Sequence, residues 1–306
     1  MKLISYRSGN QHGIGVMVDD SRFISLRRVM PDLPHSIREI LDEGIGTLKR
    51  IAEAVKGNDG DLRLAQVQLD PVIPEPHATW ALALNFPMHI EETKLTTSPD
   101  YPQIFQRMPI SIVGHGDALW CPHPKIAKTF DYEGELAVII GTPGRHIPVA
   151  TALSHVAGYA CYNEGSVREF QGHNRQFGLG KNFERSGSFG PWMMTADEFG
   201  DPKTHRVITR LNGVEKQNAT LDQMLFSVEQ VIHYLSTGYT LQVGDVIAMG
   251  TPGALRPPAG YVPGPEDSPR IPGRTRMKPG DECEVEISGL GILRNPIVAD
   301  PTPIYA

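Results

Sequence analysis

The chain has 306 residues, of which 40% are hydrophobic and 21% are charged, and 29 basic against 35 acidic side chains give a net charge of -6. This composition is typical of a globular protein that is large enough for one large domain and a small one. With no cluster of basic residues and no apolar run of bilayer length in the sequence, nucleic acid and membranes are poor candidate partners. Because residues 1–7 lack a signal-peptide pattern and the three cysteines form no C-x-x-C pair, we expect a cytoplasmic protein.

The first seventy residues or so alternate short strand patterns with helical ones. They predict strands over residues 3–6, 13–18 and 22–25, and helices near residues 37–41 and 48–55. The segment 69–76 is too rich in proline for a helix or a central strand, so we place a boundary there. The sequence therefore predicts a small α+β domain over residues 1–70 and a larger domain over residues 75–306.

The larger domain reads mainly as strands and loops from Trp80 onward. Its clearest helix begins after Ser227, which forms an S-x-x-Q capping box with Gln230, and it ends at Gly238. Turn and strand patterns follow over residues 243–253 and 277–287, with the Pro/Gly-rich loop 255–276 between them. A loop of that length is uncommon unless it has a function or is disordered.

The most informative motif is Asp131-Tyr132-Glu133-Gly134-Glu135, which continues into the apolar run 136–140. Alternate side chains of a strand share a face, so the three carboxylates should project together, where like charges repel. A hard cation such as Mg²⁺, Mn²⁺ or Ca²⁺ relieves this repulsion and prefers all-oxygen ligands. The motif by itself fits the solvated face of an antiparallel strand equally well.

Further motifs follow the carboxylates in a fixed order along the chain. They are Gly158-Tyr159 with Ser166-x-Arg168-x-x-Gln171, Gly180-Lys181 with Gly190-Pro191-Trp192, Leu211-Asn212-Gly213, and Gly244-Asp245 with Gly250-Thr251-Pro252. Together with the carboxylate motif they resemble the fumarylacetoacetate hydrolase family over about residues 75–300. The resemblance implies a mainly β fold with α+β elements, in which a mixed β-sheet roll or barrel follows the small N-terminal domain. It also implies a homodimer.

The same resemblance implies a metal site formed by Glu133, Glu135 and a third carboxylate after Gly158-Tyr159. Glu164 holds that third position, where the family usually has Asp. One extra methylene moves the carboxylate by more than a bond length, although Mg²⁺ geometry is strict. Glu164 could therefore bind through another rotamer or a water, favour a larger ion, or be a surface carboxylate. For Asp131 we expect a role in orienting a ligand or water.

His89 and Glu92 form the second part of the expected site. They are three residues apart, so they share a face on a helical turn. The residues before them resemble the family's lid segment, whose His and Glu form a water-activating dyad, and residues 98–100 suit a hinge. We expect His89 to act as the base and Glu92 to orient it, a role for which the adjacent Glu91 is less suitable.

By resemblance, four more side chains surround the metal and the substrate. Lys181 and Arg168 border the metal and the substrate carboxylate, Gln171 donates a hydrogen bond, and Thr251 caps the carboxylate. Arg107 completes the substrate-binding set. For the two arginines, surface solvation or an ion pair is the alternative. The glycine before Lys181 is expected to let the backbone approach a ligand closely.

These residues predict a metal-dependent hydrolase of a carbon-carbon bond in a 1,3-diketo acid, such as an acylpyruvate or a fumarylacetoacetate-like compound from aromatic catabolism. His89 would activate water, while Mg²⁺ or Mn²⁺ and Lys181 stabilise the enolate that leaves. The first alternative is a decarboxylase, hydratase or isomerase of a 2-oxo acid that uses the same enolate. The second is a noncatalytic metal-binding scaffold.

The loop 255–276 gives one more expectation, since it directly follows the turn at Thr251. We expect it to fold over the pocket mouth, with Tyr261 and Arg256 or Arg270 reaching the substrate. An inert surface excursion stiffened by proline is the alternative.

Overall fold

The structure is a computed structural model, and it describes residues 1–60, 62–93, 97–257, 262 and 275–304. Among these residues the largest sheet has twelve strands, and two of its pairings, β17–β6 and β14–β8, are parallel. Two short strands flank the main path, β5 (Gln68–Leu69) beside β1 and β8 (Ile112–Val113) beside β14. The path runs through β4 (Leu62–Arg63), β3 (Arg22–Ser25), β2 (Gln11–Met17), β1 (Lys2–Ser8), β14 (Gly187–Thr195), β12 (Val156–Asn163), β11 (Gly134–Ile140), β17 (Val246–Ala248), β6 (Thr79–Ala83) and β7 (Gln103–Gln106).

The remaining described strands form a second sheet and a short ribbon. The second sheet has the order β16 (Val214–Thr220), β15 (Arg206–Leu211), β18 (Glu282–Ile287), β19 (Gly291–Ala299) and β9 (Leu119–Cys121), and the ribbon pairs β10 (Phe130–Asp131) with β13 (Ser166–Val167). The expected mainly β fold with a mixed sheet and α+β elements is thereby confirmed.

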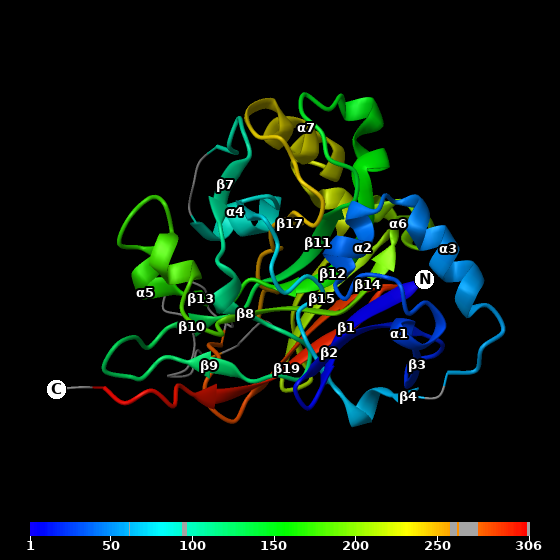
Figure 1. Cartoon of the computed structure of the whole chain (residues 1–306). Coiled ribbons are helices and arrows are strands. Elements are labelled where there is room, and N and C mark those ends of the chain that lie inside the picture. Colours follow the sequence, from blue (N-terminus) through cyan, green and yellow to red (C-terminus); the bar gives the residue numbers. More distant parts are fainter. Residues whose placement is uncertain (61, 94–96, 258–261, 263–274, 305–306) are drawn as a thin grey trace.

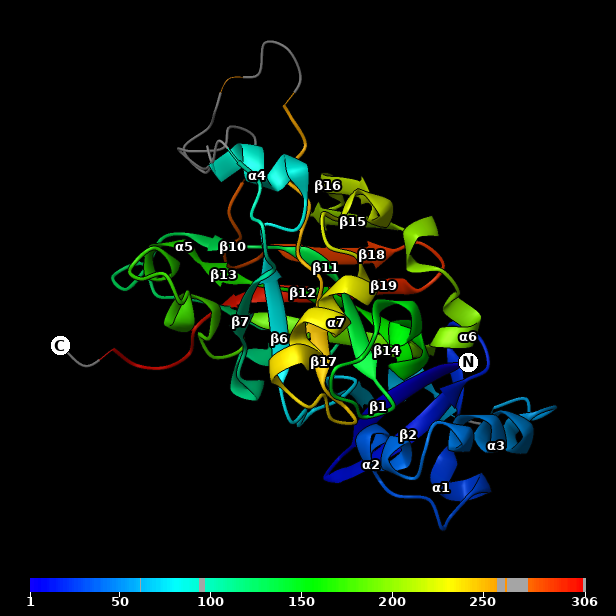
Figure 2. The same cartoon turned by 90° about the horizontal axis from the view of Figure 1, so that it is seen from above.

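The N-terminal segment has the strands and helices that its sequence pattern predicts. Strands β1 to β3 are followed by the short helices α1 (Leu26–Val29), α2 (Ile37–Asp42) and α3 (Gly46–Val55). Strand β1 pairs antiparallel with β14, so the N-terminal strands extend the large sheet. The three helices lie at one end of the molecule, and α4 (Pro87–Thr93) and α5 (Arg168–Gln171) lie at the other (Figure 1, Figure 2).

Strand β11 lies in the centre of the large sheet and separates two cores. Its residues Leu136, Val138 and Ile140 join one buried cluster, while Ala137 and Ile139 join another. Because side chains alternate across a strand, a strand that is covered on both faces needs a continuous apolar run. The run 136–140 has this property, and it anchors the carboxylate motif that precedes it.

Helix α7 (Val228–Gly238) covers the first of these cores with its apolar face. The Ser227 hydroxyl accepts a hydrogen bond from the Gln230 backbone, and the Gln230 side chain accepts one from Ser227, so the predicted capping box is confirmed. The short helix α6 (Ala196–Phe199) follows β14 directly. Within the described residues, no helix combines the length and apolarity needed to cross a membrane.

Candidate active site

The carboxylate motif lies between β10 and β11, where residues 132 and 133 make no regular strand pairing. Asp131 ends β10 and Gly134 begins β11, so the single strand expected over this stretch is wrong. Three successive backbone N–H groups donate to side chains instead, as buried backbone groups must find partners. Tyr132 N–H donates to Asp131 (3.0 Å), Glu133 N–H to Asn163 (3.1 Å) and Gly134 N–H to Gln217 (3.0 Å).

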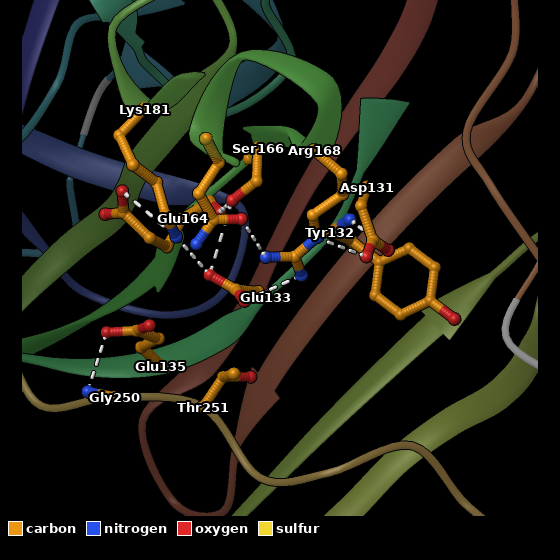
Figure 3. Close-up of polar contacts among 12 residues, drawn as sticks. Asp131, Tyr132, Glu133, Glu135, Glu164, Ser166, Arg168, Lys181, Gly250 and Thr251 are labelled. Atoms are coloured by element: carbon orange, nitrogen blue, oxygen red, sulfur yellow. Dashed lines mark hydrogen bonds and ion pairs between the residues drawn. The ribbon is translucent and has the colours of Figure 1, made fainter. Parts of the chain in front are cut away.

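Glu133 lies at the centre of a network of cations (Figure 3). Its Oε1 accepts a hydrogen bond from Arg168 at 2.7 Å, and its Oε2 accepts one from Lys181 Nζ at 2.5 Å. Arg168 also donates to Asp131 Oδ2 at 2.8 Å and to Gln171 Oε1 at 2.7 Å. The structure therefore brings together five side chains that the sequence singled out, and Arg168, with 26% of its side chain exposed, forms the accessible edge.

Arg107 lies behind Glu164, away from solvent, and both side chains are fully buried. Its guanidinium donates to Glu164 Oε1 at 2.6 Å and also to Ser111 Oγ, Ser186 Oγ and the Gly165 carbonyl. Burial opposes the charge of Arg107, but the Glu164 carboxylate raises its pKa. Its complete burial behind Glu164 argues against the expected role of Arg107 as a substrate ligand, and that role stays a prediction.

Glu135 points toward the turn that follows β17. Its Oε2 accepts a hydrogen bond from the Gly250 backbone at 2.7 Å, and only 1% of the residue is exposed. Burial, together with the charges of Glu164 and Glu133, raises its pKa well above the ordinary value. In the same turn, the Thr251 hydroxyl donates to the Gly134 carbonyl at 3.0 Å and accepts from Gln217 at 2.8 Å. Thr251 thus fastens the turn to β11, and its hydroxyl is already engaged within the protein.

The two dyad residues lie on helix α4, which begins at Pro87. Proline suits the first position of a helix, where no backbone N–H is needed. His89 Nδ1 lies 2.8 Å from Glu92 Oε2, and His89 Nε2 lies 3.8 Å from Glu133 Oε1. The imidazole thus lies between Glu92 and the carboxylate cluster, which is formed by Glu133, Glu135 and Glu164. Glu91 points elsewhere and pairs with the exposed Arg256 at 3.2 Å.

One glycine and two buried amide side chains support the backbone around the site. A Cβ on Gly180 would lie 2.1 Å from the backbone nitrogen of Gln171, so this glycine allows two protein segments to meet closely. Sequence analysis missed Asn163 and Gln217, which are buried and bind the backbone of the carboxylate motif. Only the Asn163 position, directly before Glu164, carried a signal that could have been used.

The chemistry of Glu133, Glu135 and Glu164 fits a hard divalent cation, since such ions select oxygen ligands. The buried Oε2 of Glu164 has no hydrogen-bond partner among the described residues, and burial and the neighbouring carboxylates raise the pKa of Glu135. In the described part of the chain, however, no three His, Cys, Asp or Glu side chains already converge as a metal site. The cations of the chain hold Glu133 and Glu164 instead, through Lys181, Arg168 and Arg107.

The loop expected over the pocket mouth lies mostly outside the described residues, and so do Tyr261 and Arg270. Arg256 is described, and its side chain is 87% exposed. The expected hinge residues 98–100 are described as an irregular segment that leads into β7.

Comparison with known proteins gives consistent matches, and the relatives cover nearly the whole chain. The family model for the fumarylacetoacetate (FAA) hydrolase C-terminal domain matches residues 78–298. An oxaloacetate tautomerase of Bacillus subtilis is 30% identical over 97% of this chain and 100% of its own length. A mitochondrial oxaloacetate tautomerase of Homo sapiens is 30% identical over 97% of this chain and 92% of its own. A solved structure of fumarylacetoacetate hydrolase from psychrophilic Exiguobacterium antarcticum is 30% identical, with a TM-score of 0.78 over 98% of this chain and 100% of that one.

Proposed function

The chain belongs to the fumarylacetoacetate hydrolase family, and from this premise we propose that it interconverts the enol and keto forms of a 2-oxo dicarboxylic acid of the oxaloacetate type. The observation that carries the proposal is the position of His89. Its Nδ1 is bound to Glu92, and its Nε2 lies 3.8 Å from the carboxylate cluster. A base held in this way can move a proton on a substrate that the cluster binds.

The substrate class is supported by two relatives, each named as an oxaloacetate tautomerase and each 30% identical over nearly the whole chain. Tautomerisation therefore ranks above carbon-carbon hydrolysis, whereas the sequence alone favoured hydrolysis over isomerisation. Tautomerisation needs a proton carrier and a stabilised enolate but no attacking water, so the same side chains suffice.

Glu133, Glu135 and Glu164 would hold Mg²⁺ or Mn²⁺, with Ca²⁺ also compatible with an all-oxygen site. When bound, the ion would supply Lewis acidity to the 2-oxo group of the substrate. The cation of Lys181, 2.5 Å from Glu133, adds a fixed positive charge near the enolate oxygen. The partly exposed Arg168, together with Gln171, would bind a substrate carboxylate.

His89 carries the proton in this proposal. With the Nδ1 proton donated to Glu92, its Nε2 takes a proton from the carbon next to the oxo group and returns it to the oxygen, or the reverse. The Glu92 carboxylate fixes the ring and stabilises the imidazolium that forms. The reaction rearranges one proton within the substrate, so it needs no further reactant.

Conversion of enol-oxaloacetate to the keto form, followed by its ultraviolet absorbance, tests the proposal. We expect chelated protein to lose the activity, Mg²⁺ or Mn²⁺ to restore it, and His89→Ala to remove it. A rate equal to the uncatalysed one in metal-loaded wild-type protein would refute the function.

Hydrolysis of a 1,3-diketo acid is the second candidate. It is favoured by the similarity to the Exiguobacterium antarcticum fumarylacetoacetate hydrolase and by the His89–Glu92 pair, which could equally take a proton from water. The two reactions differ in their products, since hydrolysis of an acylpyruvate releases pyruvate and a carboxylic acid, while tautomerisation leaves the mass of the substrate unchanged. Mass spectrometry of both reaction mixtures separates them.

A further inference from the structure

The turn at residues 250–254 connects the two halves of the site. At one end, the Gly250 N–H donates to Glu135 of the carboxylate cluster at 2.7 Å. At the other end, the Ala254 N–H donates to Oε1 of Glu92 at 2.5 Å, leaving Oε2 for His89. A shift of this short segment therefore changes the distance between the base and the cluster.

Gln217 on β16 holds the middle of this turn. It is fully buried, and its amide donates to the Thr251 hydroxyl at 2.8 Å and to the Pro252 carbonyl at 2.6 Å. Its carbonyl accepts from the Gly134 N–H at 3.0 Å. Both amide protons and the amide oxygen are thus used, which fixes the orientation of the side chain. Since Gly134 lies between Glu133 and Glu135, Gln217 ties the turn to the backbone of the cluster itself.

Gly253 brings the same turn into direct contact with the lid helix α4. A Cβ at this position would lie 2.8 Å from the backbone C and O of Met88 and 3.0 Å from the backbone nitrogen of His89. A side chain there would meet backbone atoms, which cannot give way as the end of a flexible side chain can. The turn therefore fixes α4 by contact at Gly253 as well as by the hydrogen bond from Ala254.

We propose that Gln217 is a positioning residue, which sets the place of the His89–Glu92 pair relative to the carboxylate cluster by holding the 250–254 turn. The inference rests on the proposed function, in which His89 carries the proton. Proton transfer needs an approach of about 2.6–3.2 Å, and a misplacement of about 1 Å can cost about 100-fold in rate. A residue that touches neither substrate nor dyad can therefore control the chemical step.

Three variants test this role. Gln217→Met keeps the volume but removes the hydrogen bonds, and Gly253→Ala pushes on α4 without touching Gln217. The matched control is Asn295→Leu, because Asn295 is also a buried amide and donates to two backbone carbonyls, those of Gly114 and Asp117, at 2.8 Å each. We expect Gln217→Met and Gly253→Ala to lower kcat about 10- to 100-fold with less than about threefold change in KM, and Asn295→Leu to leave both nearly unchanged.

A second readout does not depend on activity. The ¹⁵N resonances of the His89 ring, assigned with His89→Gln, report the bond to Glu92, and we expect them to shift in Gln217→Met and Gly253→Ala but not in Asn295→Leu. If wild-type protein converts no 2-oxo acid, the proposed function fails, and these resonances alone decide whether Gln217 positions the dyad. Unshifted resonances in Gln217→Met, or a loss of kcat no greater than in Asn295→Leu, would overturn the inference. The double variant Gln217→Met, Gly253→Ala should be little worse than the worse of its two single variants, because both changes act on the same turn.

Discussion

The two halves of the site are held in different ways. The carboxylate cluster is fixed by ion pairs, since the buried Arg107 holds Glu164, and the buried Lys181 and the partly exposed Arg168 hold Glu133. The dyad stands on the seven-residue helix α4 and is held mainly by backbone groups, through the Ala254 N–H and the contact at Gly253. A short element with few anchors opens more easily than a central strand. Changes in the cluster should therefore cost binding and stability, and changes at helix α4 should cost only the chemical step.

Removal of the metal should have the largest effect, because a bound ion contributes several kcal/mol to stabilising the transition state. We expect chelated protein to lose enol-keto conversion, Mg²⁺ or Mn²⁺ to restore it, and Glu133→Gln to prevent that rescue. The measurement is the rate during titration with each metal. Glu91→Gln is the matched control, since Glu91 lies on the same side of the molecule with 64% of its side chain exposed. Full activity in metal-free protein would contradict the role of the cluster.

Loss of the dyad should have the second largest effect, and it should impair the chemical step while leaving metal binding intact. His89→Ala and Glu92→Ala should each lower kcat by about 10²–10⁴-fold, the usual range for general acid-base catalysis, with Mn²⁺ affinity by calorimetry unchanged. If the two residues act as one unit, the double variant should be little worse than the worse single one. Additive losses would show that they have separate roles. Normal tautomerisation in His89→Ala would mean that the lid carries no proton.

Arg107→Met should act on stability, in contrast to the dyad variants. The change leaves the buried Glu164 carboxylate with only the more distant Lys181, at 3.8 Å, and breaking a buried pair in this way costs about 3–5 kcal/mol. Urea unfolding should show this loss in Arg107→Met and a large recovery in the double variant Arg107→Met, Glu164→Met. Arg256→Met, whose side chain is 87% exposed in its pair with Glu91, should change the free energy of unfolding by less than about 1 kcal/mol. Equal stability of both single variants would refute the buried-pair account.

The lid and the cluster also differ in how far the sequence predicts them. The dyad is local, because spacing of three residues on a helical turn brings His89 and Glu92 together, and the observed distance of 2.8 Å agrees. The capping box at Ser227 and the N-terminal strands are local features as well. Patterns over a few residues therefore predict the elements and the side chains that share one element.

Contacts between distant parts of the chain could not be predicted in this way. Arg107 and Glu164 are 57 residues apart, and Gln217 and Gly134 are 83 residues apart. Nothing in the stretch around Gln217 distinguishes a buried amide from an exposed one until the two sheets are placed together. The break after Asp131 has the same origin, since it depends on acceptors supplied by Asn163 and Gln217. The resemblance to the family supplied the list of residues, but it did not show that Arg107 lies behind the site.

Asp245 extends the comparison outside the site, with a smaller expected effect. Like Glu92, it is held by backbone N–H groups, those of Ala78 (3.0 Å) and Gln242 (2.8 Å). Burial raises its pKa to about 6. The folded protein therefore keeps a proton that the unfolded chain releases near pH 4, so unfolding releases a proton between about pH 4 and 6 and the free energy of unfolding falls as pH rises through that window.

Asp245→Asn removes this titration while preserving the shape of the side chain. Relative to the variant, wild-type protein should lose up to about 3 kcal/mol between about pH 4 and pH 6, with no further change at either side of the window. Urea unfolding of both proteins at half-unit steps of pH measures the difference. A difference that rises with pH would mean that the hydrogen bonds and charges around Asp245, including His77 and Tyr239, outweigh its burial. The contrast between carboxylates that are held by cations and those that are held by backbone N–H groups would then be one of geometry only.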